Sequence, residues 1–574
     1  MNILLGIINY SFCVLFSLLS ISFHLDIALL AFPLAAAFTA VSAYFYFVKV
    51  RKSDKSTLIK NIRCIIRFMQ YQPFVLLTAF VLQRAGKFGK PFALDLIMVI
   101  LWVAELITSL IIQFKLNRKF KKEIKDDANK PKGKKRILYE ILDWGDAILQ
   151  AVFTIMIINI FLFQLYEIPS ESMVPEFLIR DRVIVFKTFS GPKFPLSKVG
   201  LPNITKYNRG DVVVFRNPHY SDDRKSEVKT FFSNFLYMCT LTLVNTNRDQ
   251  NGEVKADPLV KRVVGIPGEQ LMLQNGTLYS RTKASPEFKP VEKDRLYAAW
   301  DLNPLPAETK HKIQVIPLSV QNVADRDSLE NTLKNLQIDD LRNECVKLSA
   351  QIKNAATPTD ILQNPEGILF SKSELTPLMM FRNNDLYSYR ILKTIGGWQW
   401  MEKFLTSWAK DLSQQKIDSM DLYTLSNLKL NIYTKITFAK MVLKNADLIS
   451  GKKVDLSQDM EAQKLLKTAQ NIFNYISCLD QRNMSLFPPN DEDGNPQYIP
   501  EDCYFMIGDN RYNSLDMRHA YEFWEEDLCA IDPMSVQYST NLAPEYVHSS
   551  KILGKASFRF WPPSRAGIPD KMKK

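Results

Sequence analysis

Five long apolar runs lie within the first 165 residues, and they restrict the fold more than any other feature of this 574-residue chain. The runs cover residues 3–23, 27–48, 64–83, 92–114 and 144–165. Each is close to the ~20 residues that a helix needs to cross a bilayer, although Arg67 and Pro73 interrupt the third. The first run has no basic segment before it and the second follows at once, so an uncleaved span is expected rather than a signal peptide. We therefore predict five membrane-spanning helices.

The charges between the runs predict an orientation. The net charge is +13, and much of the basic excess flanks the apolar runs, which favours an anionic membrane surface over nucleic acid as the partner. Residues 49–63 hold six Lys or Arg and residues 115–136 hold eleven, and such segments stay in the cytoplasm. Both basic segments can stay in the cytoplasm only if the third and the fourth apolar run each cross the membrane. Everything after about residue 166 is then outside the cytoplasm, although three basic residues at 84–90 oppose this scheme weakly.

A serine-rich motif, IPSESM at 168–173, comes directly after the last run. In an extended chain Ser170 and Ser172 point to the same side, so one hydroxyl could attack a carbonyl while the other donates a hydrogen bond to it. Pro169 and Pro175 restrict the backbone on either side. Taken alone, a serine-rich stretch between prolines is more often an ordinary loop.

A lysine within an apolar strand forms the second motif, VKRVVGIPGE at 260–269. Lys261 is surrounded by Val260, Val263 and Val264, and burial of this kind lowers the pKa of an amine. A neutral amine can take the proton of a serine hydroxyl, whereas an arginine cannot deprotonate in a protein. The alternative is a lysine on an edge strand whose amine reaches into water.

Four motifs occur in order: IPSESM, RGDVVVF (209–215), KRVVGIPGE (261–269) and GDNRYNSLDMR (508–518). Together they resemble the conserved boxes of bacterial type I signal peptidases, and GKASFRFWP (554–562) resembles the closing strand of that family. The resemblance covers roughly 144–218, 258–283 and 500–563. It implies a mainly antiparallel β catalytic domain in which Ser172 is the nucleophile and Lys261 the general base.

The resemblance also implies supporting roles. Ser170 and the backbone N–H of Ser172 would form the oxyanion hole, and Ser514 would orient Lys261. Asp516 would pair with Arg518, and Asp509 with Arg262. The walls of the substrate pockets would include Ile168, Pro169, Met173, Phe177 and Val260. Two positions depart from the family, because Tyr512 stands where an acid is common and Met517 replaces a small residue.

The predicted organisation is a multi-span α-helical membrane anchor, a β-rich peptidase domain and a large, mostly helical insertion. The boundaries are 1–114 for four spans, 115–143 for a basic cytoplasmic segment, 144–166 for the last span, 167–283 with 495–565 for the peptidase domain, 284–494 for the insertion and 566–574 for a basic tail. Leucines at helical spacing predict that the insertion has its own core, while a docking surface for substrates or the secretion machinery stays open. Residues 230–244 are expected to pack in the core, with a membrane-dipping loop as the alternative.

The expected function is removal of signal peptides from exported preproteins through an acyl-enzyme. The expected location is a bacterial inner membrane, with the catalytic domain on the periplasmic side. The expected partners are preproteins and the lipid bilayer, with the secretion machinery as an open alternative; neither a nucleic acid, a cofactor nor a metal is expected. Rival interpretations are the SOS-repressor self-cleavage family and a non-catalytic scaffold. Cys503 and Cys529 could pair in an oxidising compartment or remain buried thiols.

Overall fold

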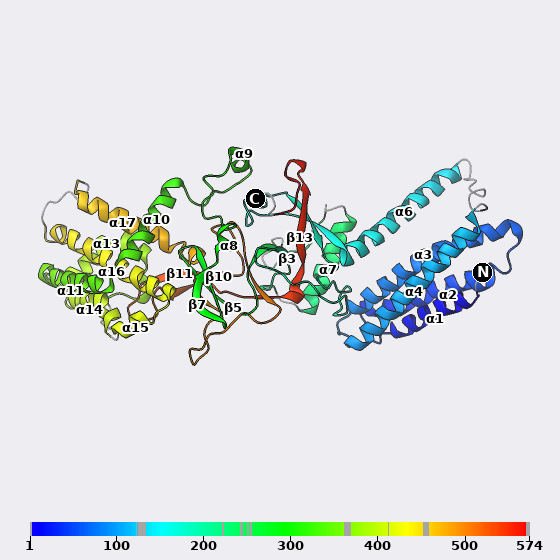
Figure 1. Ribbon diagram of the computed structural model, residues 1–574, viewed down its shortest axis with the longest axis horizontal. Coiled ribbons are helices and arrows are strands. Elements are labelled where there is room, and N and C mark those ends of the chain that lie inside the picture. The colour runs from blue at the N-terminus through cyan, green and yellow to red at the C-terminus, as the bar shows by residue number, and fades with distance from the viewer. Residues whose placement is uncertain are drawn as a thin grey trace.

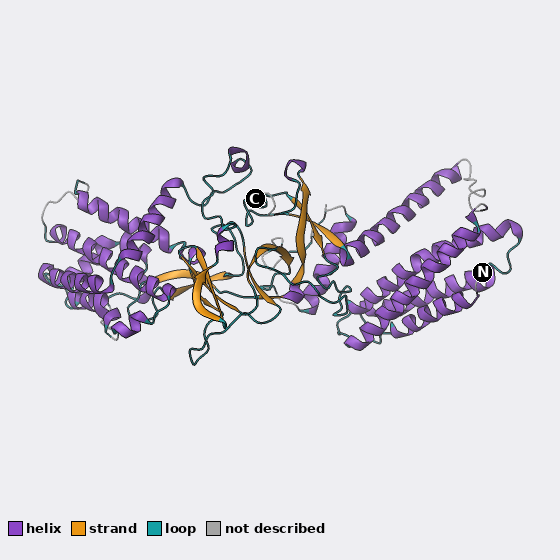
Figure 2. Cartoon of the chain, viewed as in Figure 1, coloured by secondary structure: helices purple, strands orange, loops and turns teal. Residues whose placement is uncertain are grey.

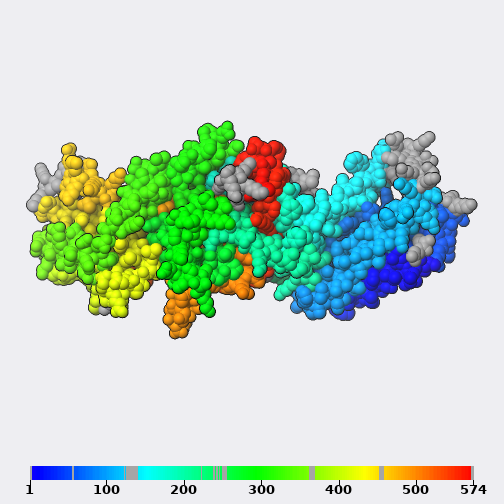
Figure 3. All heavy atoms as spheres, viewed as in Figure 1, coloured from blue at the N-terminus to red at the C-terminus, as the bar shows by residue number. Residues whose placement is uncertain are grey.

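The computed structural model shows an elongated molecule with helices at both ends and strands between them (Figures 1 and 2). The structure describes residues 3–121, 123, 134–220, 223–240, 244, 246–248, 252, 255–360, 369–410, 412–451 and 458–569. Figure 3 shows the N-terminal helices, in blue, at one end and a helical unit, green to yellow, at the other. Parts of the predicted basic segment 115–143 and of the tail 566–574 lie outside the described residues.

The N-terminal end holds the apolar helices. They are α1 (Ile3–Leu19), η1 (Ile27–Leu30), α2 (Ala31–Tyr44), η2 (Phe45–Lys49), α3 (Lys55–Arg84), α4 (Phe92–Lys119) and α6 (Lys134–Phe161). By length and composition, four stretches can cross a membrane: Ile27–Lys49, Thr57–Arg84, Phe92–Lys119 and Glu140–Phe161. The first run forms a shorter apolar helix, α1, of 17 residues.

Two apolar runs differ from the sequence prediction in their detail. The weak third run is one continuous helix through Pro73, whose carbonyl accepts a hydrogen bond from Trp102 Nε1 at 2.7 Å. The fifth run was predicted to stay helical to residue 165, which is wrong because α6 ends at Phe161. The next residues form strand β1 (Phe163–Glu167), which pairs with β2 (Arg182–Phe186). Pairing with β2 gives this backbone its hydrogen bonds, so the helix need not continue.

Buried polar side chains join α1 to α4. Asn9 Nδ2 donates to Thr108 Oγ1 at 2.8 Å and to Ser109 Oγ at 3.0 Å. Ser109 Oγ in turn donates to Glu105 Oε1 at 2.6 Å. Interhelical hydrogen bonds of this kind hold helices together where apolar packing alone gives little preference.

A seven-stranded sheet carries the sequence motifs. Its strand order is β1-β2-β13-β3-β4-β9-β12, and neighbouring strands within it pair antiparallel. Besides β1 and β2 it contains β3 (Val212–Phe215), β4 (Leu259–Gly265), β9 (Cys503–Ile507), β12 (Val547–His548) and β13 (Ile552–Trp561). The β-branched runs in β2, β3 and β4 form strands as predicted, and the mainly antiparallel β fold is confirmed.

Two smaller sheets flank this one. The first has the order β7-β6-β5-β8, formed by β5 (Glu269–Gln274), β6 (Thr277–Thr282), β7 (Ser285–Pro290) and β8 (Met484–Phe487). The second pairs β10 (His519–Asp527) with β11 (Gln537–Leu542). Strands β7 and β8 therefore extend a β-sheet into the segment 284–494.

Most of segment 284–494 is helical, at the left end of Figure 1. Its helices are α8 (Glu292–Arg295), α9 (Ala307–Lys310), α10 (Val320–Asn335), α11 (Ile338–Ala355), α12 (Pro377–Arg382), α13 (Asn384–Lys393), α14 (Gly397–Thr406), α15 (Gln414–Asp418), α16 (Leu422–Ile449), α17 (Met460–Ile476) and α18 (Leu479–Arg482). The spaced residues Leu341, Cys345, Leu348 and Ile352 are all buried in one apolar core. This core also takes in Leu528 and Val536, so the helices pack against the loop that joins β10 to β11.

The apolar segment 230–244 lies partly in a helix, α7 (Arg224–Cys239). Phe235 packs against the apolar cluster of the membrane helices, whereas Leu236 is exposed. Packing against an apolar cluster is the default that the sequence favoured for this segment.

Candidate active site

Ser172, in the turn that follows β1, lies against Lys261 of strand β4. Lys261 Nζ lies 2.6 Å from Ser172 Oγ, although 89 positions separate the two residues in the chain. The residues differ in how they are placed, because Lys261 belongs to strand β4 while Ser172 lies in a turn. Strand β4 pairs with β3 in the register Val213↔Lys261, so the sheet holds the backbone of the lysine in place.

Lys261 is buried to 3% exposure. Burial lowers the pKa of its amine to about 8, with Asp516 opposing the shift and Arg518 adding to it. An amine with this pKa is neutral in about a tenth of molecules at pH 7, far more than an ordinary lysine. Such an amine can accept the hydroxyl proton of Ser172, which activates the oxygen as a nucleophile.

Ser170 lies beside the pair. Its Oγ is 3.3 Å from Ser172 Oγ, and the side chain is exposed while Ser172 is buried. The chain is not extended here, as the sequence interpretation assumed, but bends at 170–171 and turns over 172–176. The two hydroxyls nevertheless lie on the same side, because the turn brings them together.

The GDN segment, residues 508–518, supports the site with two buried ion pairs. Arg262 binds both carboxylate oxygens of Asp509, at 2.7 and 2.6 Å, and its guanidinium stacks 3.8 Å from the ring centroid of Tyr297. Arg518 binds both oxygens of Asp516, at 2.8 and 3.0 Å. Burial acts to raise the pKa of the Asp516 carboxyl, but Arg518 outweighs it and holds that pKa well below its usual range.

Ser514 is brought to the site without the contact expected for it. Its Oγ is buried and has no hydrogen-bond partner among the described residues. A Cβ on Gly508 would lie 2.1 Å from this Oγ and 2.5 Å from the carbonyl oxygen of Ser172. Gly508 therefore leaves the space in which the GDN segment and the serine turn touch.

The apolar residues expected to wall the substrate pockets lie mostly together. Ile168, Met173 and Phe177 are buried in one cluster, and Val260 packs against it. Pro169 is exposed and lies outside this cluster. Because Met173 and Phe177 are almost fully buried, they shape the floor of the site rather than its surface.

Glu171, which lies between the two serines, was not predicted as a residue of the site. Its carboxylate is buried and accepts hydrogen bonds from the backbone N–H groups of Gln314 and Val315, the latter at 3.2 Å. Asn510 Nδ2 donates to the Glu171 carbonyl at 3.1 Å, and Asn510 N donates to the Ser172 carbonyl at 3.1 Å. Two segments far along the chain, one with Gln314 and Val315 and one with Asn510, therefore hold the serine turn in place.

Comparison with known proteins agrees with this geometry. A family model described as signal peptidase, peptidase S26, matches residues 141–334 and 442–561, together more than half of the chain. The chain belongs to this signal peptidase family. The predicted resemblance to type I signal peptidases is therefore confirmed. The matched parts leave out residues 1–140 and 335–441, so helices α1 to α4 and the stretch from α11 into α16 stand outside the family match.

Similar curated proteins carry the name signal peptidase I. That of Buchnera aphidicola subsp. Schizaphis graminum is 30% identical over 119 residues, which is 21% of this chain and 27% of that protein. Signal peptidase I P of Bacillus subtilis subsp. natto is 26% identical over 164 residues, 28% of this chain and 62% of that protein. That of Pseudomonas aeruginosa is 31% identical over 135 residues, 23% of this chain and 46% of that protein. The chain therefore spans less than two thirds of each of these relatives.

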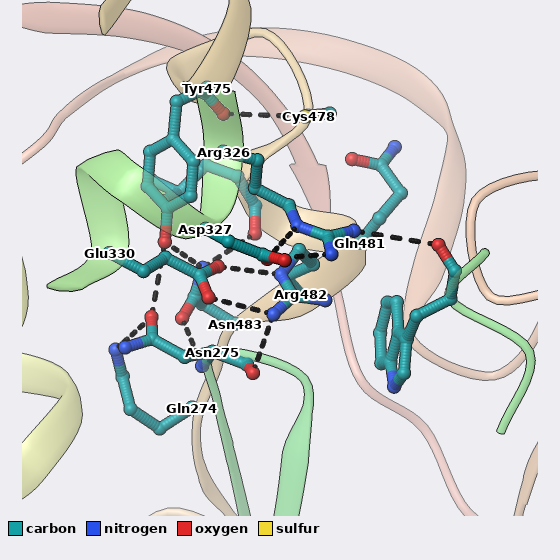
Figure 4. Close-up of polar contacts among 12 residues, drawn as sticks. Gln274, Asn275, Arg326, Asp327, Glu330, Tyr475, Cys478, Gln481, Arg482 and Asn483 are labelled. Carbon is teal, nitrogen blue, oxygen red and sulfur yellow. Dashed lines mark hydrogen bonds and ion pairs between the residues drawn. The ribbon is translucent and has the colours of Figure 1, made fainter. Parts of the chain in front are cut away.

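Tyr512, where signal peptidases commonly carry an acid, touches the helical unit. Its hydroxyl accepts a hydrogen bond from Arg326 Nη1 of α10 at 3.1 Å, and its ring lies edge-on to Trp300. Beside it, Arg482 binds both carboxylate oxygens of Glu330 at 2.7 and 2.8 Å and donates to the Asn275 carbonyl at 2.7 Å (Figure 4). The departure from the family therefore falls where the helical unit meets the GDN segment.

The remaining candidates give no second site. Both Cys503 and Cys529 are buried free thiols in different apolar clusters. Within the described parts of the chain, no group of three or more His, Cys, Asp or Glu side chains could hold a metal ion. His519 is buried, and burial lowers its pKa to about 4, while His219 lies near Glu545.

Proposed function

We propose that this protein is a membrane-bound endopeptidase that removes N-terminal signal peptides from exported preproteins. The observation that carries the proposal is the 2.6 Å contact between Lys261 Nζ and Ser172 Oγ within an apolar sheet. Membership of the signal peptidase family and the order of the four motifs support the substrate class.

The proposed reaction passes through an acyl-enzyme. Lys261 takes the hydroxyl proton of Ser172, and Ser172 Oγ attacks the carbonyl carbon of the scissile bond. Ser170 Oγ and the Ser172 backbone N–H stabilise the oxyanion, for which donors of this kind contribute about 3–4 kcal/mol. The protonated Lys261 gives its proton to the leaving amine and later activates the water that releases the acyl group. Asp516 and Arg518 form the buried ion pair beside the lysine and keep its surroundings in place.

The proposed location is a bacterial inner membrane, crossed by several helices, with the catalytic domain on the periplasmic side. The described residues of the basic segments, 49–63 and 115–121, lie at the ends of α2 and α4 opposite the sheet (Figure 1). Positively charged segments of this kind remain in the cytoplasm, which supports the orientation. The preprotein segment before the cut would then lie beside the sheet at the membrane surface.

The test is cleavage of a preprotein by the detergent-solubilised full-length protein. Ser172→Ala and Lys261→Ala should be folded and should lose cleavage by at least about a thousandfold, as expected when one member of a catalytic unit is removed. A His219→Ala, His519→Ala double variant tests a serine–histidine mechanism and should still cut. Thermal unfolding of each variant distinguishes lost chemistry from lost structure.

Binding of the preprotein without cleavage under any condition would contradict the proposal. The alternative would then be a scaffold that recognises signal peptides without cutting them. Cleavage that survives Ser172→Ala but disappears in the double histidine variant would replace the proposed pair of residues by a different one.

A further inference from the structure

The loop between β2 and β3 reaches back to the membrane helices and inserts Phe194 among them. The Phe194 ring lies edge-on to Trp102 of α4 and Phe161 of α6, with centroid distances of 5.6 and 4.8 Å. It also meets Phe80 of α3 at 6.2 Å. Phe194 is only 7% exposed, so one side chain of the catalytic part contacts three membrane helices at once.

Polar contacts lie next to the Phe194 side chain. Ser197 Oγ donates to Asp95 Oδ2 at 2.5 Å, and Asp95 Oδ1 lies 2.5 Å from Arg84 Nη2. Asp95 begins α4 and Arg84 ends α3, and both are buried. Breaking a buried ion pair is costly, so the Asp95–Arg84 pair fixes the helix ends against which the loop rests.

The catalytic part is attached to the membrane helices by non-covalent contacts as well as by the chain itself. The covalent link is where α6 passes through Leu162 into β1. Beside it, Lys187 and Thr188 bond the end of α6, Phe235 packs against the helices, and Phe194 and Ser197 contact α3, α4 and α6. A single covalent link allows the sheet to swing about it, whereas the non-covalent contacts remove that freedom. The turn that carries Ser172 follows β1 and is therefore held at a fixed height relative to the helix ends.

We infer that Phe194 is a positioning residue that sets which spacing between a preprotein's apolar segment and its scissile bond the enzyme accepts. This rests on the proposed function. The apolar segment of the substrate lies in the same bilayer as α3, α4 and α6, so the number of residues between its end and the cut bond must match the height of Ser172. If the sheet could swing, several spacings would fit about equally well.

The test uses full-length enzyme in sealed liposomes and a series of preproteins in which this spacing grows one residue at a time. The wild type should prefer one spacing, and Phe194→Ala should reduce the preference by about tenfold, the ratio that a loss of about 1.4 kcal/mol produces. Asp95→Asn tests the neighbouring polar contact and should act in the same direction. The matched control is Phe189→Ala, since Phe189 belongs to the same loop but is 64% exposed.

A short soluble peptide, which has no apolar segment, separates the inference from general damage. Phe194→Ala should cut this peptide at the wild-type rate. An unchanged spacing preference in Phe194→Ala would overturn the inference while leaving the proposed function intact. Equal loss on the peptide and on every preprotein would also overturn it, because Phe194 would then serve stability alone. Failure of the wild type to cut anything would instead remove the proposed function.

Discussion

Two lysines in the described part of the chain are almost completely buried, and their partners differ. Lys435 of α16 forms an ion pair with Asp532 and donates to the Phe404 carbonyl at 2.7 Å. Lys261 instead meets the hydroxyl of Ser172. A carboxylate partner favours the charged amine, whereas a hydroxyl does little to hold the proton. Lys435 therefore joins two parts of the fold, whereas the amine of Lys261 can exchange a proton.

The first prediction at this scale concerns pH. The pKa of Lys261 is lowered to about 8, and the neutral amine is the reactive form. The value of kcat/KM should therefore rise about tenfold per pH unit well below pH 8 and level off above it. The pH profile of a short peptide substrate measures this. A profile that is flat between pH 6 and 9, with chemistry limiting, would exclude Lys261 as the base.

The second prediction concerns Gly508. A methyl group there would meet the Ser172 carbonyl oxygen at 2.5 Å, and backbone cannot yield as a flexible side chain does. Gly508→Ala should therefore displace the serine turn, lower stability by about 1–3 kcal/mol and lower kcat more than it raises KM. Gly89→Ala is the control, since open space surrounds Gly89. Wild-type kcat in Gly508→Ala would show that the contact is not needed.

At the scale of elements, the helical unit is tied to the peptidase sheet by contacts that form no single motif. Arg326 of α10 reaches Tyr512, Arg482 reaches Asn275 between β5 and β6, and Lys435 reaches Asp532 beyond β10. The family match stops at 334 and resumes at 442, so the outer helices are an addition to a family core. Of the three residues, only Lys435 belongs to this unmatched stretch, whereas Arg326 and Arg482 lie within the matched residues.

We predict that the contact between Arg326 and Tyr512 steadies the GDN segment. Arg326→Ala should lower kcat by roughly threefold to tenfold, the loss expected for one hydrogen bond of about 0.5–1.5 kcal/mol. Tyr512→Phe removes the same hydroxyl, so the double variant should be no worse than the single ones. Lys347→Ala on α11 is the control because its side chain is 64% exposed. Additive losses would show that the two residues act separately.

The sequence predicted strands and helices where their period was clear. The β-branched runs of β2, β3 and β4 and the leucines of α11 identified both the strands and the buried helix face. The prediction that the last apolar helix reaches Leu165 failed, because a short apolar strand and the end of an apolar helix have the same composition. At the candidate site the sequence named Ser172 and Lys261, but it could not name Glu171 or Asp294. Glu171 binds backbone amides and Asp294 binds Arg511, contacts set by tertiary folding rather than by local pattern.

For the whole molecule, the arrangement of helices predicts which parts face each compartment. Gln83 of α3 binds the Leu19 carbonyl at the end of α1, and Asp26 binds the Lys87 backbone, so these helix ends lie together on the side of the sheet. Exposed Lys52 lies at the opposite ends. With an impermeant maleimide and a Cys64→Ser background, Glu292→Cys should react from the periplasmic side and Lys52→Cys only after the membrane is opened. The reverse pattern would contradict the orientation.

Strand β13 lies between β2 and β3 in the middle of the sheet, although residues 216–551 separate it from β3 in the chain. A ribosome therefore delivers Ser172 and Lys261 long before the strand that joins their halves of the sheet. Ala556 of β13 also packs in the apolar cluster beneath the serine turn. Until β13 arrives, the growing chain carries both reactive groups without the frame that brings them together. Order of synthesis alone would therefore keep the proposed active site unassembled until the last strand has been made.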